Sequence, residues 1–156
     1  NVGACFRTCD GLGVQKIIFS GYTPYPSVED DTRLPHFADK LTRQIHKTAL
    51  GAECTVDFER LNNLEEVIEK AKQENAVLIA LEQYPGSLSP EACVQKIKSQ
   101  YECRPIYLII GNEVHGVADD LLAKVDIVME IPMKGTKESL NVSVATAIAL
   151  YELTKQ

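Results

Sequence analysis

Short apolar runs alternate along the chain with segments whose apolar residues recur at helical spacing. Two runs, residues 76–81 and 106–110, are apolar throughout, which is typical of parallel strands covered on both faces. The other expected strands are residues 16–20, 55–58 and 127–131. Helices are expected at residues 1–13, 36–48, 64–71, 89–99 and 119–124, with a last one beginning near residue 139 or 141. This alternation predicts an α/β fold with an open, mainly parallel sheet and helices on both faces.

The most informative segment follows the last expected strand. That strand ends at Ile131, and a loop with Pro132 and Gly135 comes next. Ser139 and Asn141 both favour the start of a helix. Apolar residues then recur at helical spacing, namely Val142, Ala145, Ala149 and Leu153. Because α/β proteins present ligand-binding groups at the ends of their strands, this polar loop between two buried elements predicts a binding site.

Composition and charge narrow the class of protein. The chain has 156 residues, 45% hydrophobic and 24% charged, which fits one globular domain with a sizeable core. A net charge of −6 argues against broad, non-specific nucleic-acid binding, although it permits a local basic patch. No apolar run approaches the roughly 18 residues of a membrane span. The five cysteines are odd in number and lack paired metal-ligand spacing, so we expect reduced thiols and a cytoplasmic protein.

Three groups of glycines and polar residues begin a helix or adjoin an expected strand. They are Asn1, Gly3 and Arg7; Gly111, Asn112, Glu113 and Gly116; and Gly135, Ser139 and Asn141. Each group also has a purely structural interpretation. Asn1 and Ser139 could cap helices, and Glu113 could be a solvated loop acid. Two groups directly follow strands and contain glycines that permit close backbone approach, which favours a shared pocket.

The motifs of common cofactor sites are missing from the sequence. Neither the phosphate-binding pattern Gly-x-x-x-x-Gly-Lys-Ser/Thr nor the dinucleotide pattern Gly-x-Gly-x-x-Gly occurs. His36, His46 and His115 have no metal-binding spacing relative to each other or to cysteine. We therefore expect no metal site and no dinucleotide site.

Together, the three groups resemble the motifs of the SPOUT superfamily of RNA methyltransferases, in its SpoU/TrmH branch that methylates ribose 2′-hydroxyls. Asn1-x-Gly3-x-x-x-Arg7 is similar to the first motif of that branch, and Ile110-Gly-Asn-Glu-x-x-Gly116 to the second. Ile131-Pro-Met-x-Gly-x-x-x-Ser-Leu-Asn-Val-Ser-Val-Ala145 is similar to nearly all of the third. The resemblance covers essentially the whole chain. Because the family places a strand before its first motif, we expect that this strand is missing from the sequence.

The resemblance implies an α/β-knot fold, in which the C-terminal segment forms a deep trefoil knot. It also implies S-adenosylmethionine as the cofactor, bent in the knot and held by three loops. The implied cofactor-binding residues are Leu81, Glu82, Ile110, Gly111, Ile131, Met133, Gly135, Ser139 and Leu140. Because sites of this branch form between two subunits, the resemblance implies a homodimer joined through the first and last helices. The partner subunit's Arg7 would complete each site.

The implied activity is methylation of a ribose 2′-hydroxyl in tRNA or rRNA. Its catalytic residues, carried over by motif, are Arg7, Asn1, Glu113, Ser139 and Asn141. Because an arginine guanidinium does not lose its proton in proteins, we expect Arg7 to bind a phosphate beside the target ribose. Asn1 and Asn141 would orient Arg7 and the ribose. Ser139 would bond the ribose or the ligand, and Glu113 would pair with positive charge or brace the second loop.

An acidic protein needs a local basic surface to hold RNA. The expected RNA-binding residues are Arg7, Arg33, Lys40, Arg43 and Lys47. In a helix, Lys40, Arg43 and Lys47 share one face because they lie three and four residues apart. A solvated face without a partner is the alternative interpretation of this trio.

Two other functions compete with the ribose methyltransferase. A non-catalytic knotted module for RNA binding or ribosome assembly would keep the fold, but the intact set of polar motif residues argues against it. A base methyltransferase from another SPOUT branch is disfavoured because the third motif is of the ribose type. The sequence leaves open which RNA and which nucleotide are modified.

Overall fold

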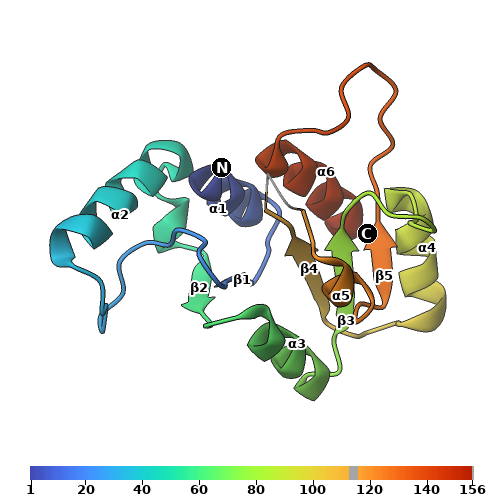
Figure 1. Ribbon diagram of the computed structural model, residues 1–156, viewed down its shortest axis with the longest axis horizontal. Coiled ribbons are helices and arrows are strands. Elements are labelled where there is room, and N and C mark those ends of the chain that lie inside the picture. Colours follow the sequence, from blue (N-terminus) through green and yellow to red (C-terminus); the bar gives the residue numbers. More distant parts are fainter. Residues whose placement is uncertain (113–115, 156) are drawn as a thin grey trace. The chain divides into compact units, whose positions relative to one another are not determined.

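A computed structural model of the protein describes residues 1–112 and 116–155 (Figure 1). The chain forms two compact units, Asn1–Val67 and Ile68–Gln156. That the whole chain is a single domain stays a prediction. The helices and strands lie close to the segments expected from the apolar pattern.

The first unit contains two main helices and a two-stranded parallel sheet. Its elements are α1 (Val2–Gly11), β1 (Lys16–Phe19), α2 (Pro35–Ala49), the 3-10 helix η1 (Ala52–Cys54) and β2 (Asp57–Arg60). β1 pairs with β2 in parallel, with Ile17 opposite Phe58. The ring of Phe6 in α1 lies 5.7 Å from that of Phe19 in β1 and 5.7 Å from that of Phe58 in β2. This aromatic cluster fastens α1 to both strands.

The two helices of the first unit cross at Gly3. A Cβ atom at this position would lie 2.2 Å from the carbonyl oxygen of Ile45 and 2.2 Å from Oγ1 of Thr48. It would also lie 2.8 Å from the backbone nitrogen of Ala49. Only a residue without a side chain allows this approach, so Gly3 sets how closely α1 lies on α2.

Arg33 holds the loop between β1 and α2 in place. Its guanidinium lies 3.7 Å from the ring centre of Tyr25 and bonds Asp31 through Nε at 2.8 Å. It also donates to the carbonyl oxygens of Tyr25 at 3.0 Å and Pro26 at 3.1 Å. The hydrogen bonds from Arg33 hold the pKa of Asp31 well below its usual range. Arg33 was expected from sequence to bind RNA. Its guanidinium is instead bonded to residues of its own loop.

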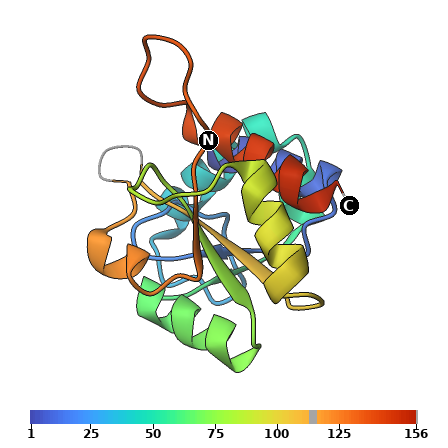
Figure 2. The same ribbon diagram turned by 90° about the vertical axis from the view of Figure 1, so that its right-hand side faces the viewer.

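The second unit is built on three parallel strands. Its elements are β3 (Val77–Leu81), α4 (Pro90–Gln100), β4 (Ile106–Ile110), α5 (Asp119–Leu122), β5 (Ile127–Met129) and α6 (Val142–Thr154). α3 (Leu64–Gln73) runs across the boundary between the two units. β3 is the central strand of the sheet, with β4 on one side and β5 on the other. α4 and α5 lie on opposite sides of this sheet (Figure 2).

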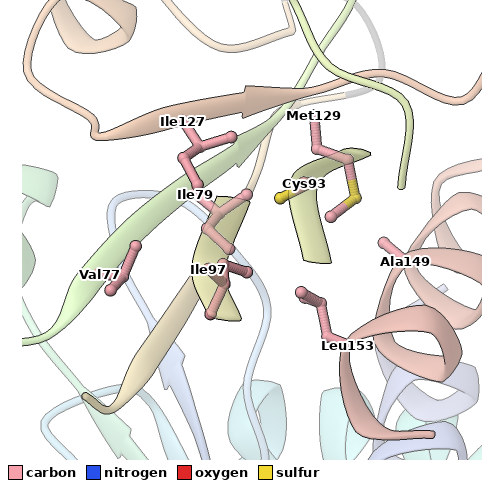
Figure 3. Packing of buried hydrophobic residues seen from close by; sticks show 8 residues of the cluster. All are labelled: Val77, Ile79, Cys93, Ile97, Ile127, Met129, Ala149 and Leu153. Carbon is pink, nitrogen blue, oxygen red and sulfur yellow. The ribbon is translucent and has the colours of Figure 1, made fainter. Parts of the chain in front are cut away.

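One face of this sheet carries a tightly packed apolar cluster (Figure 3). Val77 and Ile79 are two residues apart on β3, so their side chains point to the same face. α4 and α6 cover that face, and the cluster consists of Val77, Ile79, Cys93, Ile97, Ile127, Met129, Ala149 and Leu153. Because every member is buried, this cluster anchors α6 to β3 and β5.

The sequence predicted most element boundaries well. β4 matches its expected range, and Ser89 accepts a hydrogen bond from the backbone nitrogen of Ala92 at 3.3 Å, as expected of a cap for α4. β5 ends two residues earlier than expected, at Met129, and β2 starts two residues later, at Asp57. The prediction of one continuous sheet needs correction. In the described residues the parallel strands form two sheets, because no strand there pairs with both β1 and β3.

The described helices are all too short or too polar to cross a lipid bilayer. The five cysteines carry free thiols. Burial raises the pKa of Cys9 to about 12 and that of Cys93 to about 11, so these two thiols are poor nucleophiles.

Replacing Gly3 with alanine is expected to lower the free energy of unfolding by about 1–3 kcal/mol, because the added methyl group meets backbone atoms of α2 that cannot turn away. The control is Gly11→Ala in the same helix, where an added Cβ meets nothing within 4 Å. Gly11→Ala should leave stability unchanged or raise it by up to about 1 kcal/mol. Chemical denaturation of both variants measures the difference. Equal stabilities would contradict the close crossing at Gly3.

Candidate active site

A cavity of about 690 Å³ opens where the three strands of the second unit end. Leu81 and Ile110, the last residues of β3 and β4, both line it. Its remaining wall comes from the segments that follow β3, β4 and β5, from α5 and from the start of α6. The other lining residues are Glu82, Gln83, Tyr84, Gly111, Asn112, Gly116, Val117, Asp119, Leu122, Glu130, Ile131, Met133, Ser139, Leu140, Asn141, Val142 and Ala145. Parallel strands bring their carboxyl ends to one edge, so segments distant in sequence meet there.

Glu82 joins two of the loops around the cavity. Its carboxylate accepts a hydrogen bond from the backbone nitrogen of Val117 at 2.8 Å and another from that of Gln83 at 2.9 Å. Gly116 has a φ of +60°, and a Cβ atom there would lie 2.2 Å from Oε2 of Glu82. The glycine is therefore required both by its backbone conformation and by the approach of the carboxylate.

Asn112 and Gly116, in the segment after β4, are hydrogen-bonded to each other. The backbone nitrogen of Asn112 donates to the carbonyl oxygen of Gly116 at 3.1 Å. The backbone nitrogen of Gly116 donates in turn to the carbonyl oxygen of Asn112 at 2.8 Å. A Cβ atom at Gly111 would lie 2.4 Å from the carbonyl carbon of Gly116. Both glycines of the second motif are thus explained by close backbone contact. Glu113, expected from sequence to be catalytic, lies outside the described residues.

The third side of the cavity is the start of α6. Asn141 is the N-cap, and its Oδ1 accepts from the backbone nitrogen of Ser143 at 2.9 Å and from Oγ of Ser143 at 2.6 Å. Nearby, Nε2 of Gln83 donates to the carbonyl oxygen of Glu138 at 2.6 Å. These bonds tie the loop after β3 to the segment that enters α6.

The lining combines apolar walls with negative charge. Ile110 and Leu140 are large apolar residues that remain exposed at the cavity. Its charged side chains are Glu82, Asp119 and Glu130, and no lysine or arginine occurs among the described lining residues. Glu130 accepts a hydrogen bond from Oγ of Ser87 at 2.5 Å. Such a lining suits a neutral or cationic ligand with an apolar part, and disfavours one that carries phosphates.

Most residues expected to bind the cofactor line this cavity. They are Leu81, Glu82, Ile110, Gly111, Ile131, Met133, Ser139 and Leu140. Gly135 is exposed and does not line it. Sequence reasoning missed Asp119 and Glu130 because Asp119 opens a short helix and Glu130 fell inside an expected strand.

The remaining expected residues belong to the first unit. Asn1 is the N-cap residue of α1, although its side chain makes no capping hydrogen bond. Arg7 lies on α1 with its side chain exposed. Lys40, Arg43 and Lys47 are exposed on α2. The described residues contain no group of three or more histidine, cysteine, aspartate or glutamate side chains that could hold a metal ion.

Comparisons with known proteins agree with the motifs. The model of the SpoU rRNA Methylase family matches residues 1–151. The chain belongs to this family. Its full length is 29% identical to the 23S rRNA (guanosine-2′-O-)-methyltransferase RlmB of Pseudomonas putida and 30% identical to that of Nitrosomonas europaea. These matches cover 54% and 52% of the two relatives, so the chain spans about half the length of the curated proteins it resembles.

Solved structures of this family share the fold. An RNA 2′-O ribose methyltransferase superposes with a TM-score of 0.75 at 25% identity, covering 99% of this chain and 51% of the other. The A. aeolicus TrmH/SpoU tRNA modifying enzyme gives 0.73 at 25% identity, with 99% and 67% covered. An AdoMet-bound rRNA methyltransferase from Sinorhizobium meliloti gives 0.73 at 26% identity, with 99% and 51% covered. The α/β fold with parallel strands and flanking helices is therefore confirmed.

Asn141→Ala is expected to lower the free energy of unfolding by about 1 kcal/mol, because α6 loses the side-chain bond to its first turn. Asn141→Asp keeps an oxygen acceptor and should retain most of that stability. Thermal or chemical unfolding distinguishes the two variants. Equal losses would show that capping is not what the side chain contributes.

Proposed function

We propose that the protein is an S-adenosylmethionine-dependent methyltransferase that modifies a ribose 2′-hydroxyl in rRNA or tRNA. The main support for this proposal is the cavity at the strand ends. Segments of the second and third family motifs line it together. The family membership supports the same activity, as do the printed activities of the relatives. This chain covers only part of the length of those relatives, so their activity is proposed for it and not taken as shown.

The residues at the cavity fit S-adenosylmethionine. This cofactor carries a positive sulfonium and no phosphate, which matches a lining with three carboxylates and no described lysine or arginine. Exposed Ile110 and Leu140 offer apolar surface to a flat base. The glycines at 111 and 116 bring backbone groups to the cavity wall. When bound, the cofactor supplies an already activated methyl group.

The weak nucleophile is the obstacle in this reaction, because a ribose hydroxyl stays protonated at neutral pH. We assign the partner subunit's Arg7 to a phosphate beside the target ribose, where its positive charge favours the developing alkoxide. The proton then leaves to that phosphate or to water, since the guanidinium cannot accept it. Asn141, the N-cap of α6, and Ser139 in the preceding loop orient the ribose, and Asn1 orients Arg7. Glu113 keeps its proposed role of bracing the second loop or pairing with positive charge.

The RNA is held by the basic face of α2. Lys40, Arg43 and Lys47 lie three and four residues apart on this helix, and all three are exposed. Arg33 is left out of this surface because its loop already uses its guanidinium. A local surface of this kind lets a protein with a net charge of −6 hold a polyanion.

We also infer the deep trefoil knot of the SPOUT fold. Its support is the similarity to solved family members over 99% of the chain at TM-scores of 0.73 and 0.75. The free thiols of all five cysteines agree with a cytoplasmic location, where RNA and reducing conditions coexist.

Arg7→Ala is expected to reduce methyl transfer by about 100-fold or more, a typical loss for one charge contact in the transition state. S-adenosylmethionine affinity, measured by isothermal titration, should stay within a few-fold because Arg7 is proposed to contact RNA. The measurement uses the protein in its full natural length with RNA from cells that lack it. Mapping ribose methylation in that RNA identifies the nucleotide.

Arg7→Lys is the matched control. It keeps the charge but loses the paired donors, so its activity should fall between those of the wild-type protein and Arg7→Ala. If Arg7→Ala instead abolishes cofactor binding, the proposed role of Arg7 is wrong. If the wild-type protein binds no cofactor and its loss removes no methyl group, the non-catalytic RNA-binding module becomes the better function.

We propose that the active form is a homodimer joined through α1 and α6. α6 carries an apolar stripe in which Val144 is 48% exposed, Ile148 37% and Tyr151 57%. These residues lie four and three positions apart, so they share one face of the helix. Exposed apolar side chains gathered on one helix face favour contact with a second protein surface over contact with water.

Sedimentation at micromolar concentration should show a dimer. Ile148→Glu should shift it toward monomer and lower methyl transfer in parallel, because a charge enters the apolar stripe. Ser99→Glu, at an exposed polar position on α4, is the control and should leave the dimer intact. A monomeric protein that still methylates RNA at the full rate would overturn this proposal.

A further inference from the structure

A second hollow, of about 610 Å³, lies in the first unit between α1 and α2. Ala4, Arg7 and Thr8 contribute from α1, Lys47 and Thr48 from α2, and Leu50 follows that helix. Two positive side chains from different helices thus share one concave surface with two hydroxyl groups. Among the described residues, no carboxylate lines this hollow.

The close crossing of the helices explains why Arg7 and Lys47 share a wall. Gly3 touches α2 at Ile45, Thr48 and Ala49. Arg7 comes one turn after Gly3 on the same side of α1. Lys47 and Thr48 belong to the turn of α2 that Gly3 touches, so the crossing brings Arg7 to them.

The nearby carboxylates are engaged elsewhere. Glu53 is buried, and it bonds Nδ1 of His46 and the backbone nitrogen of Gly51, the latter at 3.1 Å. Asp10 accepts a hydrogen bond from Oγ1 of Thr55 at 2.7 Å. The two cations of the hollow therefore face solvent without a carboxylate in the lining, which suits an anion.

Leu50 is unusual in both conformation and exposure. Its φ of 54° and ψ of 37° lie in the left-handed region, where a leucine costs about 1–2 kcal/mol relative to ordinary backbone. Glycine or asparagine commonly takes this place at the end of a helix. The side chain gains no burial in return, since it is 65% exposed. A strained, exposed leucine at the rim of a hollow points to a contact made with a ligand.

We propose that this hollow binds a single phosphate of the RNA backbone between Arg7 and Lys47, with Leu50 packed against the adjoining sugar or base. Thr8 offers a hydroxyl donor to the same phosphate, whereas the hydroxyl of Thr48 donates to the carbonyl oxygen of Ile45 at 3.3 Å. The proposal rests on the proposed function, because it takes RNA as the substrate. It goes further in making Leu50 and Lys47, which also belongs to the basic face of α2, positioning residues that hold the nucleotide for Arg7.

A double-mutant cycle tests whether Arg7 and Lys47 share one phosphate. Affinity for a fluorescein-labelled single-stranded RNA of about 20 nucleotides is measured at fixed salt, without cofactor. Arg7→Ala and Lys47→Ala should each weaken binding several-fold. The double variant should lose clearly less than the product of the two single losses, because each cation depends on the other to hold the phosphate.

Lys40→Ala is the matched control, since it removes the same charge from the same helix but does not line the hollow. In the double variant, the fold-decrease in RNA affinity caused by Lys40→Ala should multiply with the fold-decrease caused by Arg7→Ala. If the losses from Lys47→Ala and Arg7→Ala multiply in the same way, the two residues contact RNA separately and the shared site is wrong. If the wild-type protein does not bind this RNA at all, the proposed function fails as well, which distinguishes the two failures.

Leu50→Gly tests the apolar contact. Glycine adopts the left-handed conformation freely, so the melting temperature should stay the same or rise. RNA affinity should nevertheless fall by about 3-fold or more, an amount that a lost apolar contact can account for. Leu34→Ala, at a leucine that is 66% exposed outside the hollow, should leave RNA affinity unchanged. Unchanged affinity of Leu50→Gly would overturn the role of Leu50.

Discussion

The cavity depends on one carboxylate, that of Glu82, and on the space left for it by Gly116. The two hydrogen bonds of Glu82 fix the loop after β3 against the loop after β4. A buried or half-buried carboxylate costs free energy unless such donors satisfy it, and here backbone groups of the site itself do so. The same side chain therefore shapes the cavity and gives it negative charge. A larger residue at Gly116 would remove both effects at once.

Glycine plays a related role in the first unit, where the approach is between helices. Gly3 lets α1 lie against backbone atoms of α2, and Arg7 follows one turn later. In both units the motif glycine determines where a charged group lies. Gly3 allows the approach of backbone atoms of α2, and Gly116 allows the approach of the carboxylate of Glu82.

Much of the fold and part of the site could be predicted from the sequence. The apolar runs gave β3 and β4 nearly to the residue, because strands covered on both faces leave an unbroken pattern. The cap at Asn141 was predictable because capping is local. The division into two sheets was not, since strand pairing depends on contacts between distant residues. The contacts of Arg33 within its own loop were missed for the same reason. A basic residue in a loop is expected to be free in solvent until partners such as Tyr25 and Asp31 are known.

Under the proposed function, the separation of charge between the two hollows would let an acidic protein bind both ligands of the reaction. The cavity of the second unit carries three carboxylates, whereas the hollow of the first unit carries Arg7 and Lys47. A cation and a polyanion would each be repelled by the other's surface, so under this proposal each unit would favour one ligand and disfavour the other. Net charge alone, at −6, describes neither surface. Under the proposed function, Arg7 on α1 and the exposed Lys40, Arg43 and Lys47 on α2 would attract RNA to the first unit.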